Sequence, residues 1–230
     1  MAETDWELME GSLDTATVSY GTVTGADAAP PEGVACLGFH SLQPCEGVSA
    51  LISTVAIQFL APMPPGRGGT IYSHTRKLIP MHQYAPMIFL ACGKNVVSAQ
   101  AYILGLSEEW PYRIALKKGL LVEGLRADDE SILGLSDAVY DTSDWHNLWL
   151  QVTVNTQGDT VLHAEKWVAG PNAFIPIPGM DDVIDDALGV LTGTPGLIGP
   201  FYPGIGHYNR AAPGRISLFD VTMYGRQTAP

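Results

Sequence analysis

The chain has 230 residues, a length that suits one large β-domain, and its 46% of hydrophobic residues can fill a sizeable core. Its 12 Lys and Arg against 24 Asp and Glu give a net charge of −12, which argues against a nucleic-acid partner because phosphate contacts need clustered basic residues. The apolar runs are too short to cross a membrane, and the N-terminus lacks the apolar stretch of a secretory signal, so we expect a cytosolic protein.

Strand patterns follow one another closely in the first part of the chain. Residues 17–23 alternate in polarity, and 33–42 and 49–60 are rich in apolar, β-branched and aromatic residues. A turn is predicted between them at 43–47. The Pro- and Gly-rich stretch 62–69 predicts a surface loop, since proline cannot donate to a β-ladder and glycine permits positive φ.

Two more strands are predicted in the middle of the chain, over 97–105 and 112–118. In the second, three apolar residues point one way, while Arg113 and Lys117 point the other way. This alternation is typical of a half-buried antiparallel strand with one face in solvent.

A β-hairpin is the clearest local pattern. Strands are predicted over 145–155 and 160–168, joined by a turn at 157–159. One face of the first strand is apolar and consists of Leu148, Leu150, Val152 and Val154.

A short helix is predicted next, over 181–191, because its apolar residues recur at helical spacing and its acids lie in the first turns. A glycine-rich turn region follows over 196–206. The last strand is predicted over 214–224, with Phe219, Val221 and Met223 on one face.

These elements indicate an all-β fold, an antiparallel β-sandwich or jelly roll with one short helix; a barrel is the structural alternative. We expect residues 1–16 to form an N-terminal arm and 17–230 to form a single sandwich domain, because no linker divides the chain further.

The second half of the chain resembles the concanavalin-A-like jelly rolls of lectins and glucanases. The similarity covers roughly residues 97–225 and depends on the strand that opens with Trp145-His146, the hairpin that ends near Trp167, and the glycine-rich stretch after it. The final strand also resembles the family pattern, but Arg215, Phe219, Asp220 and Val221 are slightly shifted from it. The resemblance implies a concanavalin-A-like β-sandwich.

A second resemblance is to structural proteins of tailed bacteriophages. It rests on residues 102–119, on an acidic leader with a tryptophan, and on an ending soon after Arg226-Gln227. It implies a non-enzymatic virion component, such as a capsid decoration, collar, tail or baseplate protein, made in the host cytoplasm. Its partners would be other virion proteins and further copies of itself in a homo-oligomer, with the acidic leader 2–11 and the loop 62–69 as docking segments.

Catalytic and metal-binding motifs are missing from the sequence, so we predict no catalytic residue, no metal and no cofactor. A retaining glycosidase needs two carboxylates about 5 Å apart, but the Glu-x-Asp-x-x-Glu run of glucanases is absent, and the adjacent Glu108 and Glu109 would point to opposite faces of a strand. The histidines form no zinc motif. Acidic runs at 128–130 and 181–186 are interpreted as solvated faces, not as Ca²⁺ loops.

The three cysteines are too few for a disulfide framework. Cys36 and Cys45 could pair across a hairpin, and their redox state stays open. Cys92 ends an apolar run and is predicted to be a buried thiol.

A glycan-binding module for host-surface recognition is the alternative function. Sugar sites combine an aromatic plate with polar groups, commonly on loops. The best candidate loop for a glycan or a partner protein contains Phe201, Tyr202, His207, Tyr208 and Asn209. The competing interpretation is that these aromatic residues pack the rim of the sandwich or a neighbouring subunit.

Overall fold

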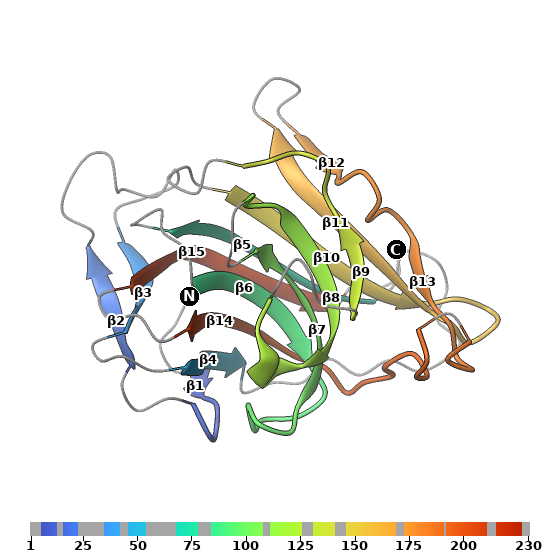
Figure 1. The fold of residues 1–230 in the computed structure, drawn as a ribbon, viewed down its shortest axis with the longest axis horizontal. Coiled ribbons are helices and arrows are strands. Elements are labelled where there is room, and N and C mark those ends of the chain that lie inside the picture. Colours follow the sequence, from blue (N-terminus) through green and yellow to red (C-terminus); the bar gives the residue numbers. More distant parts are fainter. Residues whose placement is uncertain are drawn as a thin grey trace.

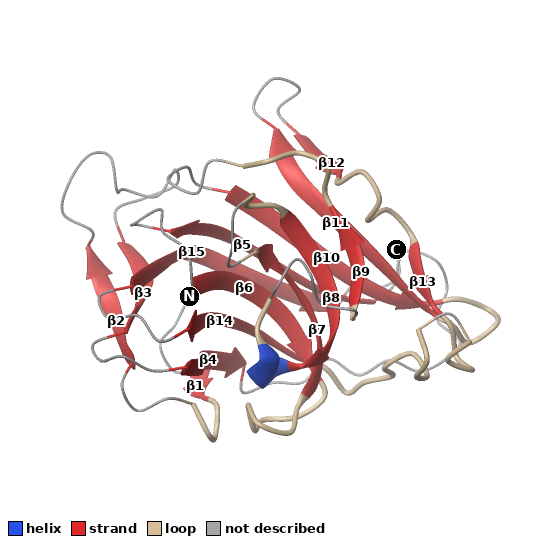
Figure 2. Ribbon diagram, viewed as in Figure 1, coloured by secondary structure: helices blue, strands red, loops and turns tan. Residues whose placement is uncertain are grey.

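The computed structural model describes residues 6–12, 16–22, 35–41, 46–53, 68–77, 84–107, 111–125, 131–140, 146–168, 173–190, 192–210 and 215–226. These residues form two stacked β-sheets whose paired strands are antiparallel (Figure 1). The helical structure of the described residues is one 3₁₀ turn, η2 (Leu121–Glu123) (Figure 2). The predicted all-β antiparallel sandwich is confirmed.

The seven-stranded sheet consists, in spatial order, of β1 (Trp6–Leu8), β4 (Glu46–Ser53), β14 (Tyr202–Arg210), β6 (Tyr84–Ala91), β7 (Gln100–Leu106), β8 (Ile114–Leu120) and β9 (Ile132–Leu135). The eight-stranded sheet consists of β12 (Ala173–Pro176), β11 (Thr160–Val168), β10 (His146–Val154), β5 (Gly68–Lys77), β15 (Arg215–Arg226), β3 (Ala35–Ser41) and β2 (Ala16–Thr22), with β13 (Val183–Asp185) also paired to β11. Strands distant in the sequence therefore lie side by side in both sheets.

The seven-stranded sheet is buried on both of its faces. Its inner face packs against the other sheet in a core that includes Leu104, Leu116 and Leu150. Its outer face carries a second apolar cluster, which includes Phe89 and Ile103 and is covered by Leu121 of η2. Side chains alternate across a strand, so the two clusters share the same strands.

The hairpin predicted over 145–168 is confirmed. β10 and β11 pair from Leu148 opposite Lys166 to Val154 opposite Thr160. The four aliphatic side chains expected on one face of β10 are all buried, at 0% exposure for Leu148, Leu150 and Val152 and 1% for Val154.

Three predictions about local structure are wrong. Where a helix is predicted over 181–191, the described residues 181–190 form β13 and turns, and Asp185, the last residue of β13, is buried. The strand predicted as half-buried, β8, is covered on both faces, with Lys117 at 0% exposure. Cys92, predicted to be a buried thiol, is an exposed residue in the turn that directly follows β6.

Two predicted elements differ from the structure in extent. Trp6–Leu8, part of the predicted N-terminal arm, pairs with β4 as an edge strand, and Met9 is buried in the outer-face cluster. The final strand, β15, shifts its pairing register with β5 between Phe219 and Thr222. The regular ladder between these two strands is therefore interrupted at that point.

Several expectations fall outside the described residues. They concern Cys45 and hence its pairing with Cys36, most of the loop 62–69, Glu108 and Glu109, and the acidic run 128–130.

Candidate functional site

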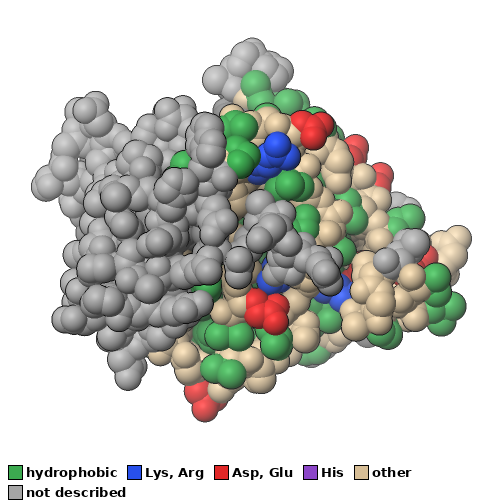
Figure 3. Space-filling model, viewed as in Figure 1, with side chains coloured by type: hydrophobic (Ala, Val, Ile, Leu, Met, Phe, Trp, Pro, Cys, Tyr) green, Lys and Arg blue, Asp and Glu red, His purple; other side chains and the backbone are tan. Residues whose placement is uncertain are grey.

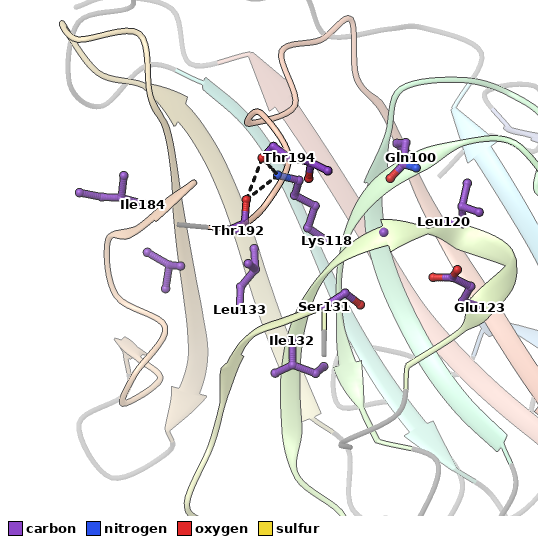
Figure 4. Close-up of a pocket in the computed structure, with 12 residues that line it drawn as sticks. Gln100, Lys118, Leu120, Glu123, Ser131, Ile132, Leu133, Ile184, Thr192 and Thr194 are labelled. Carbon is purple, nitrogen blue, oxygen red and sulfur yellow. Dashed lines mark hydrogen bonds between the residues drawn. The ribbon is translucent and has the colours of Figure 1, made fainter. Parts of the chain in front are cut away.

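A cleft of about 650 Å³ opens where β8 ends and β9 begins, facing the segment that contains β13 (Figure 4). Its size lies within the range of about 300–1,000 Å³ that is usual for small-molecule sites. It is lined by Gln100, Lys118, Gly119, Leu120, Glu123, Ser131, Ile132, Leu133, Val183, Ile184, Thr192 and Thr194.

The lining mixes hydrogen-bonding and aliphatic groups. Hydroxyl groups come from Ser131, Thr192 and Thr194, an amide from Gln100 and a carboxylate from Glu123. The aliphatic side chains include that of Ile184, which is 47% exposed. A ligand that suits this lining carries both polar groups and C–H surface.

One wall of the cleft is held in place by a buried ion pair. Lys118 of β8 and Asp185 of β13 lie 67 residues apart, and the Lys118 Nζ donates to Asp185 Oδ1 at 2.7 Å. It also donates to Thr192 Oγ1 at 3.0 Å and to the Thr194 carbonyl at 2.7 Å, as Figure 4 shows. The ion pair therefore fixes the 183–194 segment against the seven-stranded sheet.

Tyr102 completes this buried network. Its hydroxyl donates to Asp185 Oδ2 at 2.6 Å and accepts from the Leu197 backbone N–H at 2.7 Å. Burial, and then the hydrogen bond to Asp185, raise the pKa of Tyr102 far above its ordinary value. The phenol therefore stays protonated and remains a donor to the carboxylate.

A second ion pair borders the cleft from the outer face of the sheet. Lys117 Nζ lies 3.3 Å from Glu123 Oε2; the lysine side chain is 0% exposed and the glutamate side chain 49%. The lysine is therefore closed off from a ligand, whereas the carboxylate faces the cleft.

Aromatic and polar side chains also meet on the outer face of the eight-stranded sheet. Trp149 and Gln151 of β10 lie opposite Glu165 and His163 of β11, and the ring of Phe174 meets that of Trp149 edge-on at 5.3 Å between centroids. The Trp149 Nε1 and Gln151 Nε2 atoms are buried and have no hydrogen-bond partner. Because these donors are closed off from solvent, this surface is a weaker binding candidate than the cleft.

His163 is also part of a group that could hold a metal ion. A ring nitrogen of His163 and carboxylate oxygens of Asp181 and Asp182 lie within 4.8 Å of one another. Both ring nitrogens already contact carboxylates, with Nε2 at 2.8 Å from Glu165 and Nδ1 at 2.6 Å from Asp181. These contacts explain the arrangement of the group without a metal.

The residues predicted from the sequence to form a binding loop lie in or directly before a central strand. Tyr202, His207, Tyr208 and Asn209 belong to β14, between β4 and β6, and Phe201 immediately precedes it. Phe201 packs in the core between the sheets and Tyr208 in the outer-face cluster, so their rings lie on opposite faces. The structure does not bring these five residues together as one exposed surface, and a binding role for them stays a prediction.

The residues of the cleft were not identified from the sequence. Lys118 is the last residue of the predicted strand 112–118, and Asp185 lies in the acidic run 181–186, which is interpreted as a solvated face. Their pairing depends on the contact between β8 and β13, and the signal that could have suggested it is the pair of lysines, Lys117 and Lys118, within an otherwise apolar strand.

The face of the molecule in Figure 3 carries few charged groups. Over its described part, Lys, Arg, Asp and Glu side chains occur singly or in small groups among hydrophobic and uncharged atoms. No helix among the described residues is both long enough and apolar enough to span a membrane.

Comparison with known proteins supports the fold. No protein-family model matches the chain, and neither does any curated protein. It is similar to the solved structure of the VIP36 exoplasmic/lumenal domain in a Ca²⁺- and Man3GlcNAc-bound form, with a TM-score of 0.53 and 7% identity over 100% of this chain and 91% of that one.

Two further solved structures have the same fold. The cellulose-induced protein Cip1 has a TM-score of 0.52 and 11% identity over 98% of this chain and 93% of that one. The endo-β-1,4-glucuronan lyase of the fungus Trichoderma reesei has a TM-score of 0.52 and 12% identity over 96% and 95%. At these identities the likeness concerns the fold alone, and it confirms the predicted concanavalin-A-like class.

Proposed function

We propose that the chain is a non-enzymatic glycan-binding module and that its ligand occupies the cleft between β8, β9 and the 183–194 segment. The observation that carries the proposal is the lining of the cleft, which combines hydroxyl, amide and carboxylate groups with aliphatic side chains. A sugar ring has the matching surface, because it presents hydroxyl groups at its edge and C–H groups on its faces.

The fold is consistent with this proposal. Of the three similar structures, VIP36 was solved with a saccharide, and the lyase acts on a glucuronan. They support sugar recognition as a use of the fold, but they do not decide between binding and turnover. That choice depends on the carboxylates of this chain.

The carboxylates beside the cleft favour binding over hydrolysis. A glycosidase of the common type needs two carboxyl groups that both reach the glycosidic bond. Glu123 faces the cleft, but Asp185 is fully buried and receives hydrogen bonds from Lys118, Tyr102 and Thr192. Among the described residues that line the cleft, Glu123 is the one carboxylate, so these residues do not form a catalytic pair.

Assembly in a phage-like particle, with virion partners and a homo-oligomeric state, stays a prediction from the sequence resemblance. The similar structures do not support it, and they favour the glycan-binding alternative.

A glycan array followed by calorimetry tests the proposal. We expect Gln100→Ala and Ile184→Ser each to weaken binding of the best saccharide about three- to tenfold, because each removes one contact. The matched controls are Gln157→Ala and Val97→Ser, which change exposed residues outside the cleft lining and are expected to bind normally. Binding that all four variants retain would place the site elsewhere. Depolymerisation of a saccharide that Glu123→Gln abolishes would establish an enzyme.

A further inference from the structure

We infer that the cleft selects neutral glycans and rejects those that carry a uronate or another anionic group. This inference rests on the proposed glycan-binding function and specifies the class of ligand. It follows from how the charged groups around the cleft are already engaged.

The ammonium group of Lys118 already donates hydrogen bonds to three acceptors. Among the described residues that line the cleft, Lys118 is the one cation. An ammonium group has three hydrogens, and the three acceptors within reach are Asp185 Oδ1 at 2.7 Å, Thr192 Oγ1 at 3.0 Å and the Thr194 carbonyl at 2.7 Å. An anionic sugar could recruit Lys118 only by displacing one of these three acceptors, which together hold the wall of the cleft.

The hydroxyl beside Lys118 is engaged as well. Thr192 Oγ1 lies 2.8 Å from Asp185 Oδ1 and 2.8 Å from the Thr194 carbonyl, so its own hydrogen has an acceptor on either side. The positive charge of Lys118 is balanced by Asp185, whose side chain is 0% exposed. This wall therefore presents no net charge to a ligand.

The opposite side of the cleft is unfavourable to anions. The carboxylate of Glu123 is half-exposed, while its partner Lys117 is fully buried and cannot reach a ligand. A ligand carboxylate beside that of Glu123 would be repelled, and no described residue of the lining has a cation free to donate to it. Lys117, 3.3 Å from Glu123, weakens this repulsion without reaching the ligand. The net charge of −12 on the whole chain acts in the same direction at longer range.

The hydroxyl groups of a neutral sugar need no cation as a partner and are not repelled by Glu123. Gln100 and Thr194 are exposed at the cleft and can exchange hydrogen bonds with an uncharged sugar. Glu123 can accept from a sugar hydroxyl, because a carboxylate offers about four lone-pair sites and Lys117 does not occupy them all. The lining therefore favours the uncharged member of any pair of sugars that differ only in a carboxylate.

Matched saccharides test the inference. The probes are oligosaccharides of equal length and linkage that differ only at C6: β-1,4-glucan with β-1,4-glucuronan, and β-1,4-mannan with β-1,4-mannuronan, added to the full chain in calorimetry beside an array of other neutral glycans. We expect binding to a neutral glycan, with its uronate counterpart at least about tenfold weaker. A uronate bound as tightly as its neutral counterpart overturns the inference and leaves glycan binding intact. Binding to no saccharide at all overturns the proposed function together with it.

One variant and one condition assign the selectivity to the cleft. Glu123→Gln should reduce the difference in affinity between the neutral saccharide and its uronate counterpart. Glu10→Gln changes an exposed residue beside β1, at the opposite edge of the sheet, and should leave that difference in affinity unchanged. If Glu123→Gln does not fold, higher salt should narrow the same difference in the unaltered protein, because salt screens exposed charges. A difference that is insensitive to both the variant and the salt would contradict an electrostatic origin.

Discussion

At the scale of single residues, the buried pair of Lys118 and Asp185 is the contact on which the wall of the cleft most depends. Lys118→Met should lower the free energy of unfolding by about 3–5 kcal/mol, because it leaves the Asp185 carboxylate buried without its cation. Urea unfolding followed by circular dichroism measures this loss.

The control is an exposed lysine in the connection between β6 and β7. Lys94 pairs with Glu7 near β1, and both side chains are more than two-fifths exposed. Lys94→Met should therefore cost no more than about 1 kcal/mol. The double variant Lys118→Met/Asp185→Leu should recover part of the stability that the single change loses. Equal losses for Lys118→Met and Lys94→Met would show that the Lys118 pair is not buried as described.

Tyr102 should make stability sensitive to alkali. The pKa of the Tyr102 phenol is higher in the folded state than in the unfolded chain. The stability that this phenol contributes is therefore complete below its ordinary pKa of 10.0, and it is lost as the pH rises from there toward the folded-state pKa. Tyr102→Phe should cost about 1–3 kcal/mol at neutral pH, because it removes the hydroxyl from Asp185 and Leu197.

Unfolding measured across the alkaline range checks this reasoning. The stability difference between the unaltered protein and Tyr102→Phe should shrink as the pH rises above about 10, because only the unaltered protein loses the contribution of this phenol. A difference that stays constant or grows with pH would contradict the assignment.

The orientation of single residues was more predictable than their burial. The alternation in 112–118 correctly placed Lys117 on the face opposite Ile114 and Leu116. It could not show that this face is also covered, because Glu123 and the apolar residues around η2 come from outside the strand. A period of two identifies two faces, and only tertiary structure determines what lies against each.

At the scale of elements, the η2 turn covers the outer face of the seven-stranded sheet by direct contact with β14. Gly124 follows η2 with φ of +70°, and a Cβ at this position would lie 2.3 Å from the ring of Tyr208. Gly124→Ala should therefore cost the strain of positive φ and, in addition, displace the turn from the ring. Thermal unfolding measures the total.

Gly158 provides a matched control. Its φ is +90°, but a Cβ there would meet nothing within 4 Å. Gly158→Ala should cost about 1 kcal/mol from backbone strain alone, and Gly124→Ala should cost at least about 2 kcal/mol more because of the overlap. Similar losses for the two variants would indicate that the turn moves away from Tyr208 at little cost.

Elements formed from neighbouring segments could be predicted, and those that depend on distant partners could not. The hairpin over 145–168 pairs with itself, and its alternation and turn are all local. The segment 181–191 has apolar residues at helical spacing, but β13 pairs with β11 and Asp185 binds Lys118, 67 residues away. The same packing leaves Leu188 84% exposed and Val190 79% exposed, contrary to an amphipathic helix.

At the scale of the whole molecule, the seven-stranded sheet joins two apolar cores. The inner core links it to the eight-stranded sheet, while the outer cluster fixes η2 and the segment around Met9 on its other face. The sequence predicts a sandwich but not this second core, because alternating strands do not show that both faces of a sheet are covered. This second core is also an argument for a binding site at the edge of the sandwich, because apolar packing covers both faces of this sheet over its described part.

Two adjacent residues of β7 test whether the cores form one cooperative unit. Leu104 lies in the inner core and Ile103 in the outer cluster, and both are fully buried. Leu104→Ala and Ile103→Ala should each cost about 2–5 kcal/mol. Because both cores depend on the same backbone hydrogen bonds of β6, β7 and β8, each variant should shift one unfolding transition that tryptophan fluorescence and far-ultraviolet circular dichroism report together. If Ile103→Ala instead separates the two signals into two transitions, the outer cluster unfolds independently and the sheet does not couple the cores.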